Sequence, residues 1–280
     1  MALTLKSSAK VNIGLQVLGK RADGYHDIHT VFQELEFHDT ITFTKEGEDI
    51  SLTSNVAWFP TDDSNTCRKA YSIMRKQFSA IGGVKVHVEK QIPAGGGLGG
   101  GSGNAATVIK GLNILFDLGL TTSKMESIAL KVGADVPFFI RGGAQLGDGT
   151  GENLTVLPHS VSGTYLLVIP DVSINTAWAY KSLRIGLKDR KQASNFSGFL
   201  QKDLIPFEIF ENDFERIVIP AHPEIGTIKE QLYSVGARYA SLSGSGSTVF
   251  GIFDDEVSAM EAESNFQHHY NTVLTFPVRI

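Results

Sequence analysis

Hydrophobic residues alternate with polar or small residues near the start of the chain. Every second position from Ala9 to Val17 is apolar, which is the period of a half-buried β-strand. Strand character continues over residues 29–45 and 50–58 and returns over 82–92. Asp23-Gly24 lies between the first two of these segments and is typical of a turn. The N-terminal part of the chain is therefore predicted to form an antiparallel, alternating sheet.

Helical spacing of apolar residues appears in later segments. One helix is predicted to begin at Asp63 or Ser64 and to end near Ile81, and others are predicted over 104–116, over 123–133, from Pro223 and over 256–266. Strands are predicted over 164–170 and 272–278, and residues 142–154 are predicted to be a loop-rich return. The order of these elements predicts an α+β protein with two lobes, which we divide into residues 1–155 and 156–280.

The segment 92–106, IPAGGGLGGGSGNAA, places seven glycines in the nine positions between Gly95 and Gly103, after a predicted strand and before a predicted helix. Gly95, Gly97 and Gly100 satisfy the dinucleotide pattern GxGxxG, but an antiparallel sheet is the wrong context for it. No GK[ST] follows, which excludes a Walker loop. Unpaired N–H groups at a helix start attract phosphate, and glycine lets the backbone approach it closely. A phosphate-binding loop is favoured over a flexible or tightly packed one.

Two charged residues stand among small and apolar neighbours. Lys10 shares a strand face with Asn12, opposite Val11 and Ile13, and this face is either solvated or functional. Asp135, in GADVPFF, is either a turn or cap aspartate or a general base kept ionised by a lysine. Both alternatives stay open at the level of sequence.

Two further segments are candidates for ligand contacts. Tyr25 could stack on a planar ring while His26 hydrogen-bonds to its edge, and a core tyrosine with a surface histidine is the alternative. The glycine-serine segment 241–251 is either an ordinary turn or a second backbone surface for the ligand of the first loop. The histidines show no regular metal-ligand spacing.

Composition narrows the class of protein. The chain has 280 residues, 42% of them hydrophobic and 20% charged, as in an ordinary soluble globular protein. Its net charge of -5 gives no support for nucleic-acid binding. A single cysteine, Cys67, excludes an internal disulfide and is expected to be buried or incidental. No apolar run reaches the roughly 18 residues of a membrane span, and no secretion signal is recognised, so a cytoplasmic location is expected.

Five features in this order resemble the GHMP small-molecule kinases: Lys10, RADGYH, PAGGGLGGGSGNAA, GADVPFF and SLSGSGSTVFG. The three motifs of that superfamily match at residues 8–14, 93–106 and 242–251. RADGYH, the long glycine run and NDFE at 212–215 favour the subfamily that acts on a cytidine-diphosphate-linked methylerythritol. The resemblance implies an N-terminal domain like domain 2 of ribosomal protein S5 and a C-terminal ferredoxin-like domain.

The resemblance also implies an activity and roles for individual residues. The activity is the ATP-dependent phosphorylation of the 2-hydroxyl of the cytidine-diphosphate-linked methylerythritol, in non-mevalonate isoprenoid precursor biosynthesis. Asp135 would take the proton from the tertiary hydroxyl, and Lys10 would stabilise charge. ATP with Mg²⁺ would contact Asn65, Lys90, Pro93, Ala94, Gly95, Gly96, Gly97, Leu98, Gly99, Gly100, Gly101, Ser102 and Gly103. Ser102 is the one possible metal ligand among the motif residues. The substrate would contact Asn12, Tyr25, His26, Phe32, Thr176, Tyr180 and Gly244.

Two segments depart from the family pattern. Gly103 stands where the family more often has a second serine, and INTAW at 174–178 replaces a serine/proline-threonine-proline pattern. The alternatives are another GHMP kinase of the homoserine or mevalonate type and a non-catalytic ligand sensor of the same fold. The expected partner is the small-molecule substrate, without nucleic acid or membrane, and the protein is expected to be a monomer or weak homodimer.

Overall fold

The computed structural model describes residues 2–183, 192–200 and 205–278. Contacts within the chain define two compact units. The first comprises the described residues up to 9 together with 37–94 and 99–142, and the second comprises 10–36, 95–98 and the described residues from 143 onward. Strands β1 (Ala2–Lys20) and β2 (His26–Lys45) contribute residues to both units. The division of the sequence at residue 155 stays a prediction.

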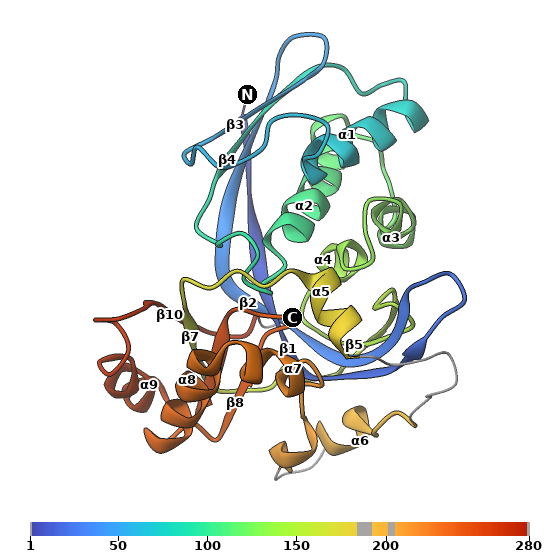
Figure 1. The fold of residues 1–280 in the computed structure, drawn as a ribbon. Coiled ribbons are helices and arrows are strands. Elements are labelled where there is room, and N and C mark those ends of the chain that lie inside the picture. The colour runs from blue at the N-terminus through green and yellow to red at the C-terminus, as the bar shows by residue number, and fades with distance from the viewer. Residues whose placement is uncertain (1, 184–191, 201–204, 279–280) are drawn as a thin grey trace. The chain divides into compact units, whose positions relative to one another are not determined.

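The first unit combines a sheet with a group of helices. Strand β4 (Val84–Glu89) pairs in parallel with β3 (Ile50–Ser54) and antiparallel with residues 40–45 of β2. Helices α1 (Thr66–Gln77), α2 (Gly100–Leu115), α3 (Thr122–Leu130) and α4 (Val136–Arg141) pack on one another to one side of these strands (Figure 1). A Cβ at Gly111 of α2 would lie 2.5 Å from the Phe43 ring, so the helix lies close against β2. The predicted strands and helices here are confirmed, but the prediction of a wholly antiparallel sheet is wrong, because β3 and β4 run parallel.

Helix α1 begins later and ends earlier than its sequence predicts. Asn65, not Asp63 or Ser64, is its N-cap, because the Asn65 side chain accepts the N–H of Cys67 at 2.8 Å. Ser64 instead donates both its N–H and its hydroxyl to Asp62 in the preceding turn. The helix ends at Gln77 rather than near Ile81.

The loop-rich segment after Gly142 contains two strands that its composition did not predict. They are β5 (Ala144–Asp148), which pairs antiparallel with residues 30–33 of β2, and β6 (Asn153–Val156), which pairs with β5. Weak strand propensity is overridden here by pairing with a neighbouring strand. Both strands pair within the second unit.

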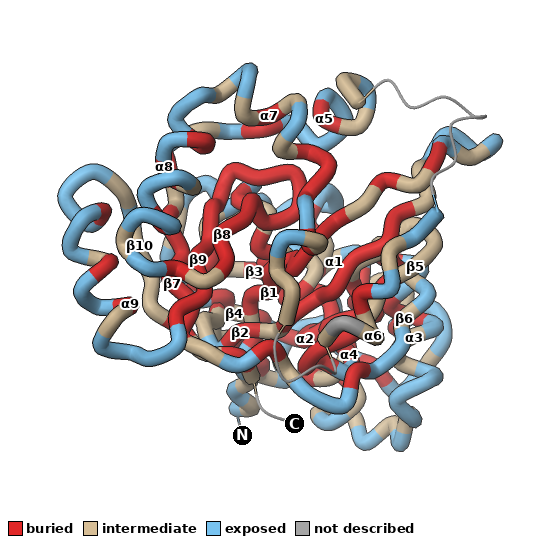
Figure 2. Tube along the Cα trace, turned by 90° about the horizontal axis from the view of Figure 1, so that it is seen from below, coloured by how far each residue is buried: buried red, intermediate tan, exposed pale blue. Residues whose placement is uncertain are grey.

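The second unit contains a four-stranded antiparallel sheet. Its strands are β7 (Thr164–Ile169), β8 (Tyr239–Leu242), β9 (Val249–Phe253) and β10 (Asn271–Thr275), in the order β10-β7-β9-β8. Helices α8 (Pro223–Ser234) and α9 (Glu256–Glu263) pack on this sheet and share one apolar core with it. Figure 2 shows β8 and β9 buried along their whole length. The β-α-β-β-α-β order is that of a ferredoxin-like fold, as predicted.

Between β7 and α8, the described residues form four short helical segments. They are α5 (Thr176–Ser182), α6 (Phe196–Leu200), the 3₁₀ helix η1 (Phe207–Ile209) and α7 (Glu215–Ala221). Across the described ranges, none of the helices combines the length and apolar character that crossing a lipid bilayer requires.

Candidate functional site

A buried ion pair lies at the base of the first glycine loop. Asp39 of β2 is fully buried, and its carboxylate pairs with the ammonium group of Lys90. Its second oxygen accepts the N–H groups of Gln91 and Ile92, each at 2.8 Å. A Cβ at Gly100 would lie 3.2 Å from Lys90 Nζ. Asp39 therefore fixes the backbone that leads into the glycine loop, whereas the implied contact of Lys90 with ATP stays a prediction.

Asp39 was not among the candidate residues, although the sequence contains a signal for it. Asp39, Ile41 and Phe43 occupy alternate positions of β2, so their side chains face the same side of the strand. Ile41 and Phe43 are both buried there. A carboxylate at an inward position of an alternating strand requires a partner. In this fold the partner is Lys90. Asp39 precedes helix α1 in the sequence, and Lys90 follows it.

The start of α2 has the properties of an anion-binding site. Its N-cap, Gly99, has a φ of +72°, and no acidic side chain occupies the first turn. The first N–H groups of a helix have no acceptor within it, and the helix dipole adds positive potential there. Ser102 is half-buried in this turn. Among the described residues, no atom lies within 4 Å of a Cβ placed on Gly95.

Helix α1 also supports this loop. The hydroxyl of Thr66 donates to the carbonyl of Gly101 at 2.7 Å, a contact that sequence analysis did not predict. The amide of Asn65 donates to Pro60 O at 2.5 Å as well as capping the helix, so its polar atoms bind the polypeptide, and its contact with ATP stays a prediction. Cys67 is buried as expected, and burial raises the pKa of its thiol to about 12.

Lys10 and Asn12 lie together on β1 as the alternation predicts. The ammonium group of Lys10 donates to Asn12 Oδ1 at 2.5 Å, and it lies 5.6 Å from the centre of the Phe32 ring. The Asn12 amide donates to Thr30 Oγ1 at 3.0 Å, which in turn donates to the Gly14 carbonyl at 2.6 Å. Lys10 and Asn12 are both buried. The solvated-face alternative for this strand is therefore wrong.

The glycine-serine segment 243–248 packs on the first glycine loop. We call it the third loop because it lies within the third superfamily motif. The hydroxyl of Ser243 donates to Gly97 O at 3.0 Å, and the N–H of Thr248 donates to Gly96 O at 3.2 Å. A Cβ at Gly244 would lie 3.4 Å from Asn12 Oδ1 and 3.6 Å from Lys10 Nζ. The second unit thus brings both glycine segments to the Lys10–Asn12 pair.

Aromatic side chains from distant segments stack beside this region. The His26 ring stacks on Tyr180 with 4.9 Å between centroids, and Tyr180 meets Phe214 edge-on. Burial, and then the charge of Lys20, lower the pKa of His26 from its ordinary value, which favours the neutral imidazole. Tyr25 is 65% exposed. The stack unites His26 with Tyr180, two of the residues implied to bind substrate.

Thr176 and Asp135 complete the predicted set. Thr176 Oγ1 lies 3.0 Å from Ser245 Oγ, so α5 contacts the third loop. Asp135 occupies the N-cap position of α4, but its side chain makes no capping hydrogen bond. Its carboxylate therefore does not cap the helix, although the residue lies in a turn as the other alternative predicts, and its pairing with Lys10 stays a prediction. Among residues 2–183, 192–200 and 205–278, no group of three His, Cys, Asp or Glu side chains could hold a metal ion.

Sequence models of two domains match this chain. The GHMP kinases N terminal domain matches residues 65–143, and the GHMP kinases C terminal domain matches residues 195–272. The first range contains the glycine loop and Asp135, and the second contains the third loop. With the two-sheet fold, these matches define an ATP-dependent small-molecule kinase of the GHMP class.

Full-length relatives narrow the class. The 4-diphosphocytidyl-2-C-methyl-D-erythritol kinase of Chlorobium phaeobacteroides (strain BS1) is 38% identical over 98% of this chain and 97% of its own. The enzyme of that name from Chlorobium chlorochromatii (strain CaD3) is 39% identical over 96% of this chain and 95% of its own. The chain therefore belongs to the GHMP kinases and, among them, to the family of these relatives.

Solved structures show the same fold. A crystal structure of 4-(cytidine 5'-diphospho)-2C-methyl-D-erythritol kinase is 26% identical, with a TM-score of 0.84 over 99% of this chain and 100% of that one. Homoserine kinase from Cytophaga hutchinsonii is 18% identical, with a TM-score of 0.67 over 98% of this chain and 95% of that one. The second likeness shows the fold alone.

Proposed function

We propose that this protein transfers a phosphoryl group from ATP to the 2-hydroxyl of 4-diphosphocytidyl-2-C-methyl-D-erythritol, in isoprenoid precursor biosynthesis by the non-mevalonate route. The family of its full-length relatives supports this substrate. The observation that carries the proposal is the approach of the third loop to Lys10 and Asn12 beside the first glycine loop. Backbone from both loops and a buried ammonium group meet at one place in the second unit.

Phosphoryl transfer depends mainly on positioning and on electrostatic stabilisation of developing charge. Lys10 would supply fixed positive charge, and its buried ammonium group already lies against a neutral amide rather than in water. Asp135 would accept the hydroxyl proton of the substrate, which its freedom from a capping bond supports. Asn12 would orient the reacting end of the substrate.

The stacked ring pair would bind the cytosine. Stacking on Tyr180, with 4.9 Å between the ring centroids, fixes the plane of the His26 ring. A neutral imidazole can both donate and accept a hydrogen bond, which fits the edge of a cytosine. Tyr25 is proposed to stack on the cytosine, helped by Phe32 and Thr176, and the Gly244 backbone is proposed to contact the substrate.

ATP would supply the phosphoryl group and, with Mg²⁺, the divalent charge that neutralises the phosphates. The residues present fit phosphate, because the start of α2 offers unpaired N–H groups without an acidic side chain. We propose that Asn65, Lys90 and residues 93–103 hold the nucleotide and that Ser102 is the protein's contribution to the metal.

The proposal also covers domain division, location, oligomeric state and partners. The two lobes are divided at residues 155 and 156, the protein acts in the cytoplasm as a monomer or weak homodimer, and it binds neither nucleic acid nor membrane. The net charge of -5 supports the last of these.

The test is ADP release with ATP, Mg²⁺ and 4-diphosphocytidyl-2-C-methyl-D-erythritol, beside homoserine and mevalonate. We expect turnover with the cytidine compound alone. Asp135→Asn should lower kcat by at least ~100-fold, because it removes the proton acceptor. The matched control is Asp254→Asn, where the side chain is 79% exposed and wild-type kcat is expected.

Each unfavourable outcome has a distinct meaning. Turnover of homoserine or mevalonate instead would assign another GHMP activity. Binding of ATP without turnover by the folded protein would identify a ligand sensor. Near-normal kcat in Asp135→Asn would remove Asp135 from the mechanism while leaving the substrate assignment intact.

A further inference from the structure

The segment Asn212–Glu215, which we call the NDFE segment, attaches to β1 beyond Lys10 and Asn12. The N–H of Leu15 donates to the Glu211 carbonyl at 2.9 Å, and the N–H of Asp213 donates back to the Leu15 carbonyl at 2.8 Å. The Asp213 carboxylate also accepts the N–H of Val17 at 2.8 Å. Position 212 therefore has a fixed place relative to the strand that carries Lys10.

The side chain of Asn212 binds the backbone at the start of the third loop. Its amide nitrogen donates to the Leu242 carbonyl at 2.7 Å and to the Gly244 carbonyl at 2.8 Å. Its oxygen accepts the N–H of Phe214 at 3.0 Å. The side chain is 98% buried, and both of its N–H donors are directed at one loop.

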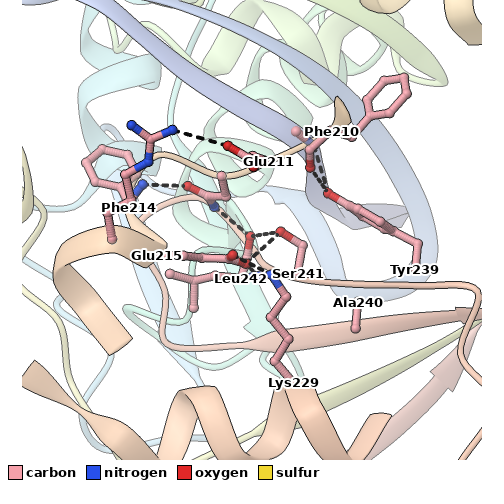
Figure 3. Close-up of polar contacts among 12 residues, drawn as sticks. Phe210, Glu211, Phe214, Glu215, Lys229, Tyr239, Ala240, Ser241 and Leu242 are labelled. Atoms are coloured by element: carbon pink, nitrogen blue, oxygen red, sulfur yellow. Dashed lines mark hydrogen bonds and ion pairs between the residues drawn. The ribbon is translucent and has the colours of Figure 1, made fainter. Parts of the chain in front are cut away.

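Glu215, the last residue of the NDFE segment, holds the end of β8 directly before the third loop. One carboxylate oxygen accepts the N–H of Leu242 at 2.9 Å and the Ser241 hydroxyl at 3.0 Å, and the other pairs with Lys229 of α8 at 2.5 Å (Figure 3). The peptide groups on both sides of Leu242 are therefore held by the NDFE segment.

This arrangement determines which way the third loop presents its backbone. The peptide between Gly244 and Ser245 is trans, so its N–H points away from its carbonyl. Because the Asn212 amide binds the Gly244 carbonyl, the N–H of Ser245 is directed away from Asn212. The Cα of Gly244 faces Asn12 and Lys10. Rotation of this peptide would change which groups face the proposed catalytic lysine.

We propose that Asn212 is a positioning residue for phosphoryl transfer, which sets the orientation of the Gly244 peptide relative to Lys10 and Asn12. This inference rests on the proposed function for its kinetic consequence, but the loop geometry itself can be measured without turnover. Asn212 touches neither substrate nor ATP in the proposal. It acts through the backbone of the third loop.

The experiment is Asn212→Asp in the full-length protein. The change preserves side-chain shape but replaces both donors by a carboxylate oxygen that repels two carbonyl groups. We expect kcat to fall by at least about 30-fold, equal to about 2 kcal/mol in the barrier. KM for both substrates should stay within about 3-fold, because binding groups are retained. Amide hydrogen exchange over residues 241–248 should rise by at least about 10-fold without ligands.

Asp213→Asn is the matched control. It is the neighbouring residue and a change of equal size, and its carboxylate binds the Val17 N–H of β1 and the Arg216 side chain. Its kcat should stay within about 3-fold of wild type, even where its melting temperature falls. An equal loss of kcat in both variants would overturn the proposal, because general destabilisation would then explain it. Wild-type kcat or unchanged loop exchange in Asn212→Asp would also overturn it.

A second variant covers the case in which Asn212→Asp does not fold. Glu215→Gln keeps an acceptor for the Leu242 N–H but removes the charge that faces Lys229, so faster loop exchange and a roughly 5-fold lower kcat are expected. Unchanged exchange and kcat would then overturn the proposal. An inactive wild-type protein would contradict the proposed function instead, while its loop exchange would still test the role of Asn212.

Discussion

The two glycine loops are held at their bases by different chemistry. Asp39 holds the strand that leads into the first loop with a buried ion pair and two backbone N–H groups. Asn212 holds the third loop with a neutral amide that donates to two carbonyl groups. The backbone at the base of the first loop is therefore sensitive to the loss of a charge. The backbone at the base of the third loop is sensitive to the direction of a peptide group.

The comparison also distinguishes two reasons for glycine. Gly95 and Gly97 have nearly the same φ, +72° and +75°, which L side chains rarely adopt. No atom of the described residues lies within 4 Å of a Cβ at Gly95, whereas a Cβ at Gly97 would overlap the Ser243 carbonyl oxygen of the third loop. Gly95 is required by backbone conformation alone, and Gly97 also by the close approach of the two loops.

The largest effect is expected from Gly97→Ala. Positive φ costs about 1–2 kcal/mol for a residue with a Cβ, and overpacking against backbone adds about 1–3 kcal/mol. We expect the free energy of unfolding to fall by about 4 kcal/mol, measured by urea denaturation. Gly95→Ala is the control and should lose only about 1–2 kcal/mol. Equal losses in the two variants would mean that contact with Ser243 is unimportant.

A smaller loss is expected from Lys90→Met. Removing one partner of a buried ion pair costs about 3–5 kcal/mol, and the lower end applies here because Asp39 keeps its two N–H donors. We expect a loss of about 3 kcal/mol in the free energy of unfolding. The double variant with Asp39→Asn should be more stable than Lys90→Met, because no unpaired charge is then buried. A double variant as unstable as the sum of the single changes would contradict this explanation.

The smallest effect is expected from Gly103→Ser, the residue more usual in the family. A Cβ there would lie 2.9 Å from the Ser8 carbonyl oxygen and 3.1 Å from Ser7 Oγ. Residues 7 and 8 must shift to accept it, so stability should fall by about 1–2 kcal/mol. Gly101→Ser is the matched control in the same helical turn. The nearest atom to a Cβ at Gly101 is 3.7 Å away, so thermal denaturation should show no loss.

Much of the secondary structure could be predicted because it depends on local patterns. Alternation gave β1, β2 and β4, and helical spacing gave α2, α8 and α9. The two strands β5 and β6 were not predicted because the segment around them is rich in glycine, and because β5 pairs with β2, which lies far away in the sequence. The N-cap of α1 was misplaced because Asp63, Ser64 and Asn65 are all good caps, and the Asp62 turn decided among them.

The sequence by itself determined the phosphate-loop candidate, the shared strand face of Lys10 and Asn12 and the resemblance to a kinase family, whereas the burial of that face was decided by the fold. These are properties of glycine density, of period-two alternation and of motif order. Only the tertiary structure decided what each loop rests on. Ser243 and Gly97 are 146 positions apart, and Asp39 and Lys90 are 51 apart. Hydrogen bonds and ion pairs act only over a few ångströms, so the folded chain alone brings these groups within reach.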